Sequence, residues 1–168
     1  MTFPVLDREP VRLPTLAGHD DELWDALIEL SEVRPGEWTL IGGQMVFLHA
    51  IEQGASPPRV STDLDVLINA RIAARSGHIP RPSLLGAVVA KALAVAIDDA
   101  PAAQRLDFVF LLSLISDPLA LAAELTPKDR RRIRARKELL TGEHRVWNEL
   151  ETHFWCRGPC DLIVRSVI

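Results

Sequence analysis

The chain has 168 residues, of which 48% are hydrophobic and 25% are charged, and its formal net charge is −4. This length is enough for one domain with a buried core, and the composition is that of a soluble globular protein rather than a disordered one. The acidic balance excludes a protein that binds polyanions over its whole surface.

We expect a cytoplasmic protein that does not cross a membrane. Residues 1–17 hold acidic residues and prolines and lack the apolar segment of a signal peptide. The most apolar predicted helix, residues 83–97, is too short and too interrupted to span a bilayer.

The first predicted helix begins at the acidic run after His19, extends to about Glu32 and ends before Pro35-Gly36. A strand starting at Trp38 follows, and it ends at Gly42-Gly43. A Gly pair permits backbone angles that other residues resist and lets another group approach closely.

Apolar residues in Gln44–Gln53 indicate a helix directly after Gly43, and His49 on this helix is expected to pack in the core with one nitrogen satisfied. A Gly turn before a helix N-terminus presents free backbone N–H groups that suit a phosphate. The alternative is a tight turn without a ligand.

A second strand is predicted over Ser61–Ile68, and it carries two carboxylates, Asp63 and Asp65, on one face. Such a pair repels itself unless it is solvated or bridged by a cation, and a hard ion such as Mg²⁺ suits it. The alternative is an edge strand with one solvated face.

Two apolar helices are predicted over 83–97, with Ser83 as its cap, and over 101–116, packed as a hairpin. Lys91 stands alone in the first helix. It is either a lysine that extends to the surface or a cation directed at phosphates or at the two carboxylates. Asp107 lies early in the second helix, where it complements the helix dipole.

The strongly basic stretch is a helix predicted to begin at Thr126, its cap, and to be ended by residues 139–142, with its cations between Lys128 and Lys137. Three interpretations of the basic face of this helix are open: it binds RNA phosphates, it docks on an acidic partner, or it is a solvated helix surface. The residues we select as RNA or partner contacts are Arg130, Arg131 and Arg134.

A last amphipathic helix is predicted over 143–154. Cys156 and Cys160 follow it, and their spacing is either a weak half of a metal site or a pair of free thiols.

Gly42-Gly43, the helix after it and the R-V-S-T-D-L-D-V sequence of residues 59–66 together resemble the core of the polymerase-beta-like nucleotidyltransferases. The likeness is greatest to the small bacterial branch that includes the AbiE-type abortive-infection toxins. It continues more weakly into residues 81–91 and into Leu106-Asp107.

This resemblance implies an Mg²⁺ ion bound by the two carboxylates as the catalytic pair, and a Gly turn that holds the nucleotide phosphates. The residues it places in the site are Gly42, Gly43, Ser61, Asp63, Asp65 and Lys91. It also implies NTP as substrate, a tRNA end or protein hydroxyl as acceptor, and an antitoxin protein as a partner in a toxin–antitoxin pair.

The sequence departs from the family at one place. The family has a third carboxylate on a later strand, but residues 70–81 contain no Asp or Glu, and the family's middle section is missing. A degenerate nucleotidyltransferase that binds a nucleotide or a protein without turnover is therefore the alternative function. A third carboxylate from Asp98, Asp99 or Asp107 would favour the enzyme.

The expected fold is α/β, with a small mixed sheet of the nucleotidyltransferase type followed by a helical C-terminal half. The sheet and its helices would occupy residues 1–80, and the helical region, residues 81–168, would pack on them as one compact unit.

Overall fold

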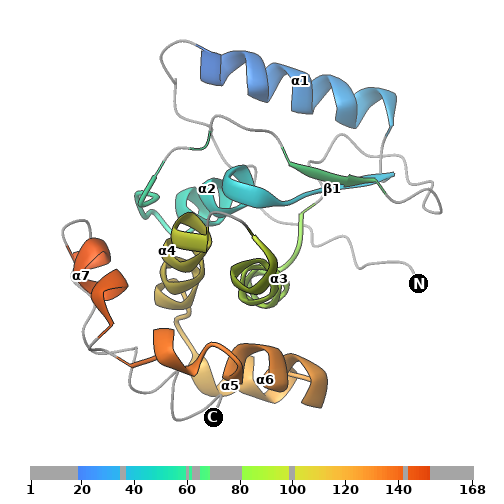
Figure 1. The fold of residues 1–168 in the computed structure, drawn as a ribbon. Coiled ribbons are helices and arrows are strands. Elements are labelled where there is room, and N and C mark those ends of the chain that lie inside the picture. Colours follow the sequence, from blue (N-terminus) through green and yellow to red (C-terminus); the bar gives the residue numbers. More distant parts are fainter. Residues whose placement is uncertain are drawn as a thin grey trace.

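The computed structural model describes residues 19–34, 37–59, 61, 65–68, 81–98, 101–141 and 144–151 of the chain. Seven α-helices and two short strands lie in these ranges, in the order α1-β1-α2-β2-α3-α4-α5-α6-α7, with a 3₁₀ turn, η1, between α6 and α7 (Figure 1). Their bounds are α1 His19–Val33, β1 Trp38–Leu40, α2 Gly42–Glu52, β2 Val66–Ile68, α3 Leu84–Ile97, α4 Pro101–Ser113, α5 Pro118–Glu124, α6 Pro127–Arg134, η1 Lys137–Leu139 and α7 Arg145–Glu151.

The two strands form an antiparallel ribbon in which Trp38 pairs with Ile68 and Leu40 pairs with Val66. Each strand has three residues, and 70% of the described structure is helix. The prediction of an α/β fold with a small mixed sheet is therefore wrong. Hydrophobic β-type residues identify a strand locally, but they do not specify how many partners it has, and here no described segment extends the ribbon into a sheet.

Helices α3 and α4 make the most extensive contact in the described structure, as the predicted hairpin requires. In α4 every residue from Asp107 to Leu112 is buried, so this helix is surrounded on all sides by other elements. Helix α3 also contacts α2 and α6, and helix α4 also contacts α2 and α7 (Figure 1). One hydrophobic cluster extends from Trp24 in α1 to Leu150 in α7.

Helix α1 lies beside the ribbon, on the side away from α3 and α4 (Figure 1). Trp24 and Leu27 are buried, and the ring of Trp24 lies 5.7 Å from the ring of Phe47 in α2, centroid to centroid. This aromatic contact connects α1 to the helix that follows the ribbon.

The helix caps follow the sequence closely. The Ser83 hydroxyl accepts a hydrogen bond from the Gly86 N–H at the start of α3, and the Thr126 hydroxyl accepts one from the Asp129 N–H at the start of α6. The expected caps Ser83 and Thr126 are thus confirmed. Helix α6 ends at Arg134, before the predicted end at residues 139–142, and the 3₁₀ turn η1 follows it.

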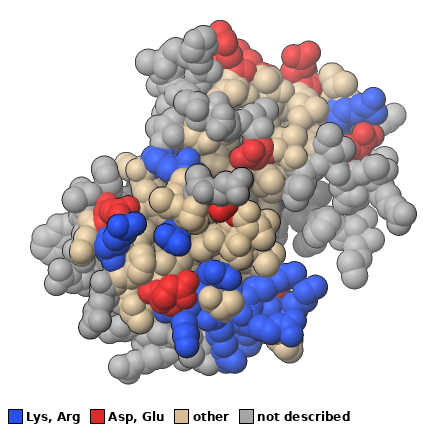
Figure 2. Space-filling view, in the orientation of Figure 1, with Lys and Arg blue, Asp and Glu red and all other residues tan. Residues whose placement is uncertain are grey.

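Figure 2 shows that Lys and Arg side chains gather in one area of the surface. The basic residues of α6 and η1 supply this positive charge, in a chain whose net charge is −4.

No single helix in the described ranges has both the length and the apolar character needed to cross a membrane. Helices α4 and α5 meet that test only when taken together, and they are bent by 112° relative to each other.

Phe108 is fully buried at the centre of α4, and we expect Phe108→Ala to lower the free energy of unfolding by about 3–5 kcal/mol, because it leaves a cavity where several helices meet. Leu119→Ala in α5 is the matched control. Leu119 is 72% exposed, so its loss should change stability by no more than about 0.5 kcal/mol. Urea unfolding measures both, and equal effects would contradict the assignment of α4 as the core helix.

Candidate functional site

The Gly turn, Gly42-Gly43, connects β1 to α2 and is held against β2. Ile41 is extended, and its backbone N–H donates to the carbonyl oxygen of Asp65 at 2.9 Å, which continues the pairing of the ribbon by one residue. Gly42 then turns the chain with a φ of +71°, a backbone angle that L side chains rarely adopt. Helix α2 begins at once and has no acidic residue in its first turn.

Three residues approach the Gly turn closely: Ser61 and Asp65, which were predicted for the site, and Arg59, the first residue of the motif over residues 59–66. A Cβ atom placed on Gly42 would lie 2.1 Å from Oδ2 of Asp65, and one on Gly43 would lie 2.3 Å from Cβ of Ser61. The second would also lie 3.4 Å from Nη2 of Arg59. Both glycines are therefore required by space, and Gly42 also by its backbone angle. The sequence prediction that other groups approach this turn is confirmed.

Ser61 is held in place by the helix that follows the turn. Its backbone carbonyl oxygen accepts a hydrogen bond of 2.6 Å from the side-chain amide of Gln44, which is buried in the first turn of α2. This bond fixes the loop before β2 against α2.

Asp65 is exposed, and its carboxylate lies beside the N-terminal end of α2. A carboxylate in that position has the oxygen ligands that Mg²⁺ prefers. Asp63, its predicted partner, lies outside the described residues. Among the residues that are described, no three or more His, Cys, Asp or Glu side chains are grouped so as to hold a metal ion.

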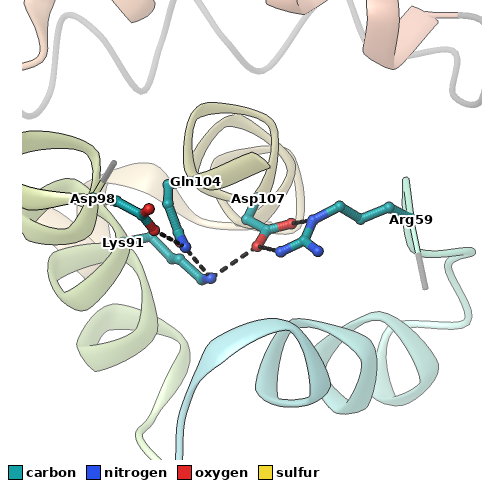
Figure 3. Close-up of polar contacts among 5 residues, drawn as sticks. All are labelled: Arg59, Lys91, Asp98, Gln104 and Asp107. Carbon is teal, nitrogen blue, oxygen red and sulfur yellow. Dashed lines mark hydrogen bonds and ion pairs between the residues drawn. The ribbon is translucent and has the colours of Figure 1, made fainter. Parts of the chain in front are cut away.

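A buried polar group lies next to the Gly turn, and we call it the Asp107 cluster: Arg59, Lys91, Asp98, Gln104 and Asp107 (Figure 3). At its centre is Asp107 of α4, whose side chain is 1% exposed. Its two oxygens accept hydrogen bonds from Nε of Arg59 at 2.9 Å and from Nη2 of Arg59 at 2.6 Å. This two-point contact fixes the plane of the guanidinium group.

Lys91 of α3 approaches Asp107 from the other side. Its Nζ lies 2.8 Å from Oδ2 of Asp107 and donates to Oε1 of Gln104 at 2.7 Å. Gln104 in turn donates to Asp98 at 2.6 Å (Figure 3). The Lys91 side chain is only 3% exposed, so it does not extend to the surface, and its charge faces a carboxylate instead.

Arg59 brings a positive charge to the point where the Asp107 cluster meets the Gly turn. Asp107 contacts two cations, Arg59 and Lys91, and carries a single negative charge. The Arg59 side chain is 29% exposed and lies beside Gly43, near the positive end of the α2 dipole. The cation, the helix N-terminus and the Gly turn together favour an anion at this place, and the carboxylate of Asp65 lies there.

The sequence interpretation missed the ion pair between Lys91 and Asp107, because it explained each residue separately. A signal was present. A single Lys in an apolar helix and a single Asp in the next apolar helix have to find partners when the two helices pack as a hairpin, since unpaired buried charges are costly.

A second polar contact lies on α2 and involves His49, Glu52 and Arg81. His49 is 2% exposed, and Nη1 of Arg81 lies 2.7 Å from its Nδ1. Arg81 also forms an ion pair with Glu52. His49 is thus the buried packing residue that the sequence predicts, and Arg81 attaches the start of α3 to α2.

The three arginines predicted as RNA or partner contacts have different surroundings. Arg130 donates from Nη2 to the carbonyl oxygen of Ala122 in α5 and is half-buried. Arg131 and Arg134 are exposed. All three are on α6, which packs mainly on α3, so the structure does not bring them to the Gly turn. Cys156 and Cys160 lie outside the described residues.

Comparison with known proteins gave no match to a family model, to a curated protein or to a solved structure.

We expect Asp107→Ala to lower the free energy of unfolding by about 3–5 kcal/mol, because the substitution leaves the buried ammonium group of Lys91 without a carboxylate. The companion variants are Lys91→Met and the double variant Lys91→Met/Asp107→Ala. The double variant should lose less stability than the sum of the two single variants, since it leaves no unpaired charge from this pair. Urea unfolding of all four proteins gives the coupling, and strictly additive losses would show that the pair is not coupled.

Proposed function

We propose that the chain binds a nucleoside triphosphate with Mg²⁺ at the Gly turn and transfers the nucleotidyl group to a hydroxyl acceptor. The observation that carries this proposal is the close approach of Asp65 to Gly42 and of Arg59 to Gly43. A potential metal ligand and a phosphate-binding cation thus lie on the same two-residue turn at a helix N-terminus. The resemblance of residues 42–66 to the nucleotidyltransferase motifs supports the same function.

Each residue of the turn has a definite role in this proposal. Gly42 and Gly43 present the backbone N–H groups at the start of α2 to the phosphates, beside Asp65 and Ser61, which fill the space that side chains on the two glycines would need. Arg59 offers a planar guanidinium group that pairs with phosphate oxygens. Asp65 supplies a carboxylate ligand for the metal ion, which when bound offsets triphosphate charge and polarises the α-phosphorus.

Lys91 and Asp107 act on the turn through Arg59. Asp107 holds the guanidinium group in one orientation, and Lys91 holds the carboxylate of Asp107. In this proposal Lys91 contributes its charge to the site without direct contact with the nucleotide. Fixing Arg59 before the nucleotide arrives reduces the entropy lost on binding.

The reaction exchanges a phosphoanhydride bond of the NTP for a phosphoester bond to the acceptor. The acceptor hydroxyl oxygen forms a bond to the α-phosphorus, the bond from that phosphorus to the bridging oxygen breaks, and pyrophosphate leaves with the electron pair. The proton of the hydroxyl group is lost to solvent. The contribution of the chain is to position the phosphates and to neutralise their charge.

One observation favours the alternative, a nucleotide-binding module without turnover. Active nucleotidyltransferases of the resembling family have a third carboxylate that is placed to activate the hydroxyl group. Asp107 is buried and both of its oxygens accept hydrogen bonds from Arg59, so it does not serve as a free base. Asp98 accepts a hydrogen bond from Gln104, and Asp99 lies outside the described residues.

The test is titration calorimetry of each NTP, with and without Mg²⁺, on the wild type and on Asp65→Asn. We expect Mg²⁺-dependent binding by the wild type, and binding weakened by at least about tenfold in Asp65→Asn, which loses a charged ligand. Asp25→Asn, on an exposed position of α1, is the matched control and should bind as the wild type does.

Transfer of label from an α-³²P-labelled NTP to RNA or protein then separates the two functions. Transfer that requires Asp65 supports the enzyme, and binding without transfer supports the module. A folded wild type that binds no NTP in the presence of Mg²⁺ would overturn both.

A further inference from the structure

The positive area in Figure 2 comes from a short part of the chain that is distinct from the Gly turn. Seven of the ten residues from Lys128 to Lys137 are Lys or Arg. We call the exposed side chains Lys128, Arg131, Arg134 and Lys137 the basic face. We propose that the basic face is a docking surface for the phosphate backbone of RNA.

The local structure of α6 explains why these side chains point outward. Thr126 and Pro127 start the helix, and Ile133, which is 1% exposed, anchors it on the core. Lys128 and Arg131 are one turn apart on the side opposite Ile133. The cap and this one buried residue therefore hold the helix on the core.

Two of the other cations have structural partners. Arg132 pairs with Asp129 at 3.3 Å, and Arg130 donates to the carbonyl oxygen of Ala122. The hydrogen bond from the Thr126 hydroxyl lowers the pKa of Asp129, which thus remains a carboxylate at neutral pH and offsets part of the positive charge. These contacts account for Arg130 and Arg132, and they do not involve Lys128 or Arg131.

Helix stability does not account for the basic face either. Cations in the last turn of a helix complement its dipole, which explains Arg131 and Arg134 in part. Lys128 lies in the first turn, where a positive charge opposes the dipole. A cation placed against the dipole, on the same side as Arg131, points to an external anion.

The composition of the basic face favours phosphates over an acidic protein. Protein interfaces have apolar or aromatic residues at their centre. The large hydrophobic side chains that are exposed in the described residues are Ile28, Val33, Leu93, Ile97 and Leu119, and none of them is on α6 or η1. A surface of Lys and Arg without an apolar centre is typical of contact with a nucleic-acid backbone.

The dimensions also fit a short stretch of one strand. Lys128 and Arg134 are six positions apart, which is about 9 Å along the helix and is the scale of a few backbone phosphates. The outward residues do not include Asn, Gln, Ser or Thr that could read bases, so we expect little sequence preference. The choice of RNA over DNA rests on the proposed function, in which the acceptor is a hydroxyl group. RNA carries a 2′-hydroxyl group on every nucleotide, and DNA does not.

The experiment measures binding of a fluorescein-labelled single-stranded RNA of about 16 nucleotides and mixed sequence, by anisotropy, without NTP. The test variant is Lys128→Gln/Arg131→Gln. The control variant, Arg34→Gln/Arg145→Gln, removes the same two charges from exposed positions on the segment after α1 and on α7. Circular dichroism and thermal unfolding confirm that both variants are folded.

We expect the test variant to bind the RNA about ten- to thirtyfold more weakly at about 0.1 M salt, and the slope of log affinity against log salt to fall by about 1.4. The control variant should bind as the wild type does. Equal losses in the two variants would overturn the proposal, because they would show an effect of net charge alone.

Two further arms test the identity of the occupant. Equal affinity for DNA of the same sequence would overturn the choice of RNA. Binding of poly-L-glutamate in the absence of RNA binding would overturn the proposal in favour of an acidic protein. Asp65→Asn should keep full RNA affinity, so failure of the nucleotide site and failure of the basic face are distinguishable.

Discussion

The contact between Asp107 and its two cations determines how the parts of this protein meet. Asp107 is on α4, Lys91 is on α3, and Arg59 is in the loop before β2, so one carboxylate connects three segments that are distant in sequence. Buried charges are costly unless each has a partner with good geometry. The cluster therefore restricts the helical hairpin and the ribbon to one relative arrangement, in which the guanidinium group of Arg59 lies beside Gly43.

The Gly turn is a second constraint, and it depends on the absence of side chains. Asp65 and Ser61 occupy the positions that Cβ atoms on Gly42 and Gly43 would need. A ribbon of two three-residue strands has little stability alone. Here it is supported by α1 on one side and by α2 with the helical hairpin on the other (Figure 1). The turn is thus held firmly enough to position a carboxylate without a larger sheet.

Much of the helical structure follows from the sequence, but the sheet does not. Hydrophobic periodicity and the Ser83 and Thr126 caps predict α3 and α6 because helices depend on contacts within a few residues. Strand pairing depends on distant partners, so Trp38 and Val66 indicate two strands but not the sheet they form. The Gly42-Gly43 pair predicts the close approach of other groups to the turn. The ion pair between Lys91 and Asp107 can be predicted only when it is known which faces of the two helices meet.

The Gly turn and the basic face hold their cations in different ways, and this difference separates their roles. At the Gly turn the cations are buried or half-buried, and a carboxylate fixes them, which suits a small anion held in one geometry. On the basic face the cations are exposed and long, which suits a flexible polyanion held mainly by counterion release. Since the chain as a whole has a net charge of −4, attraction of phosphates depends on where these cations are placed. The concentration of exposed cations on α6 and η1 therefore makes the basic face the place where a polyanion would be held.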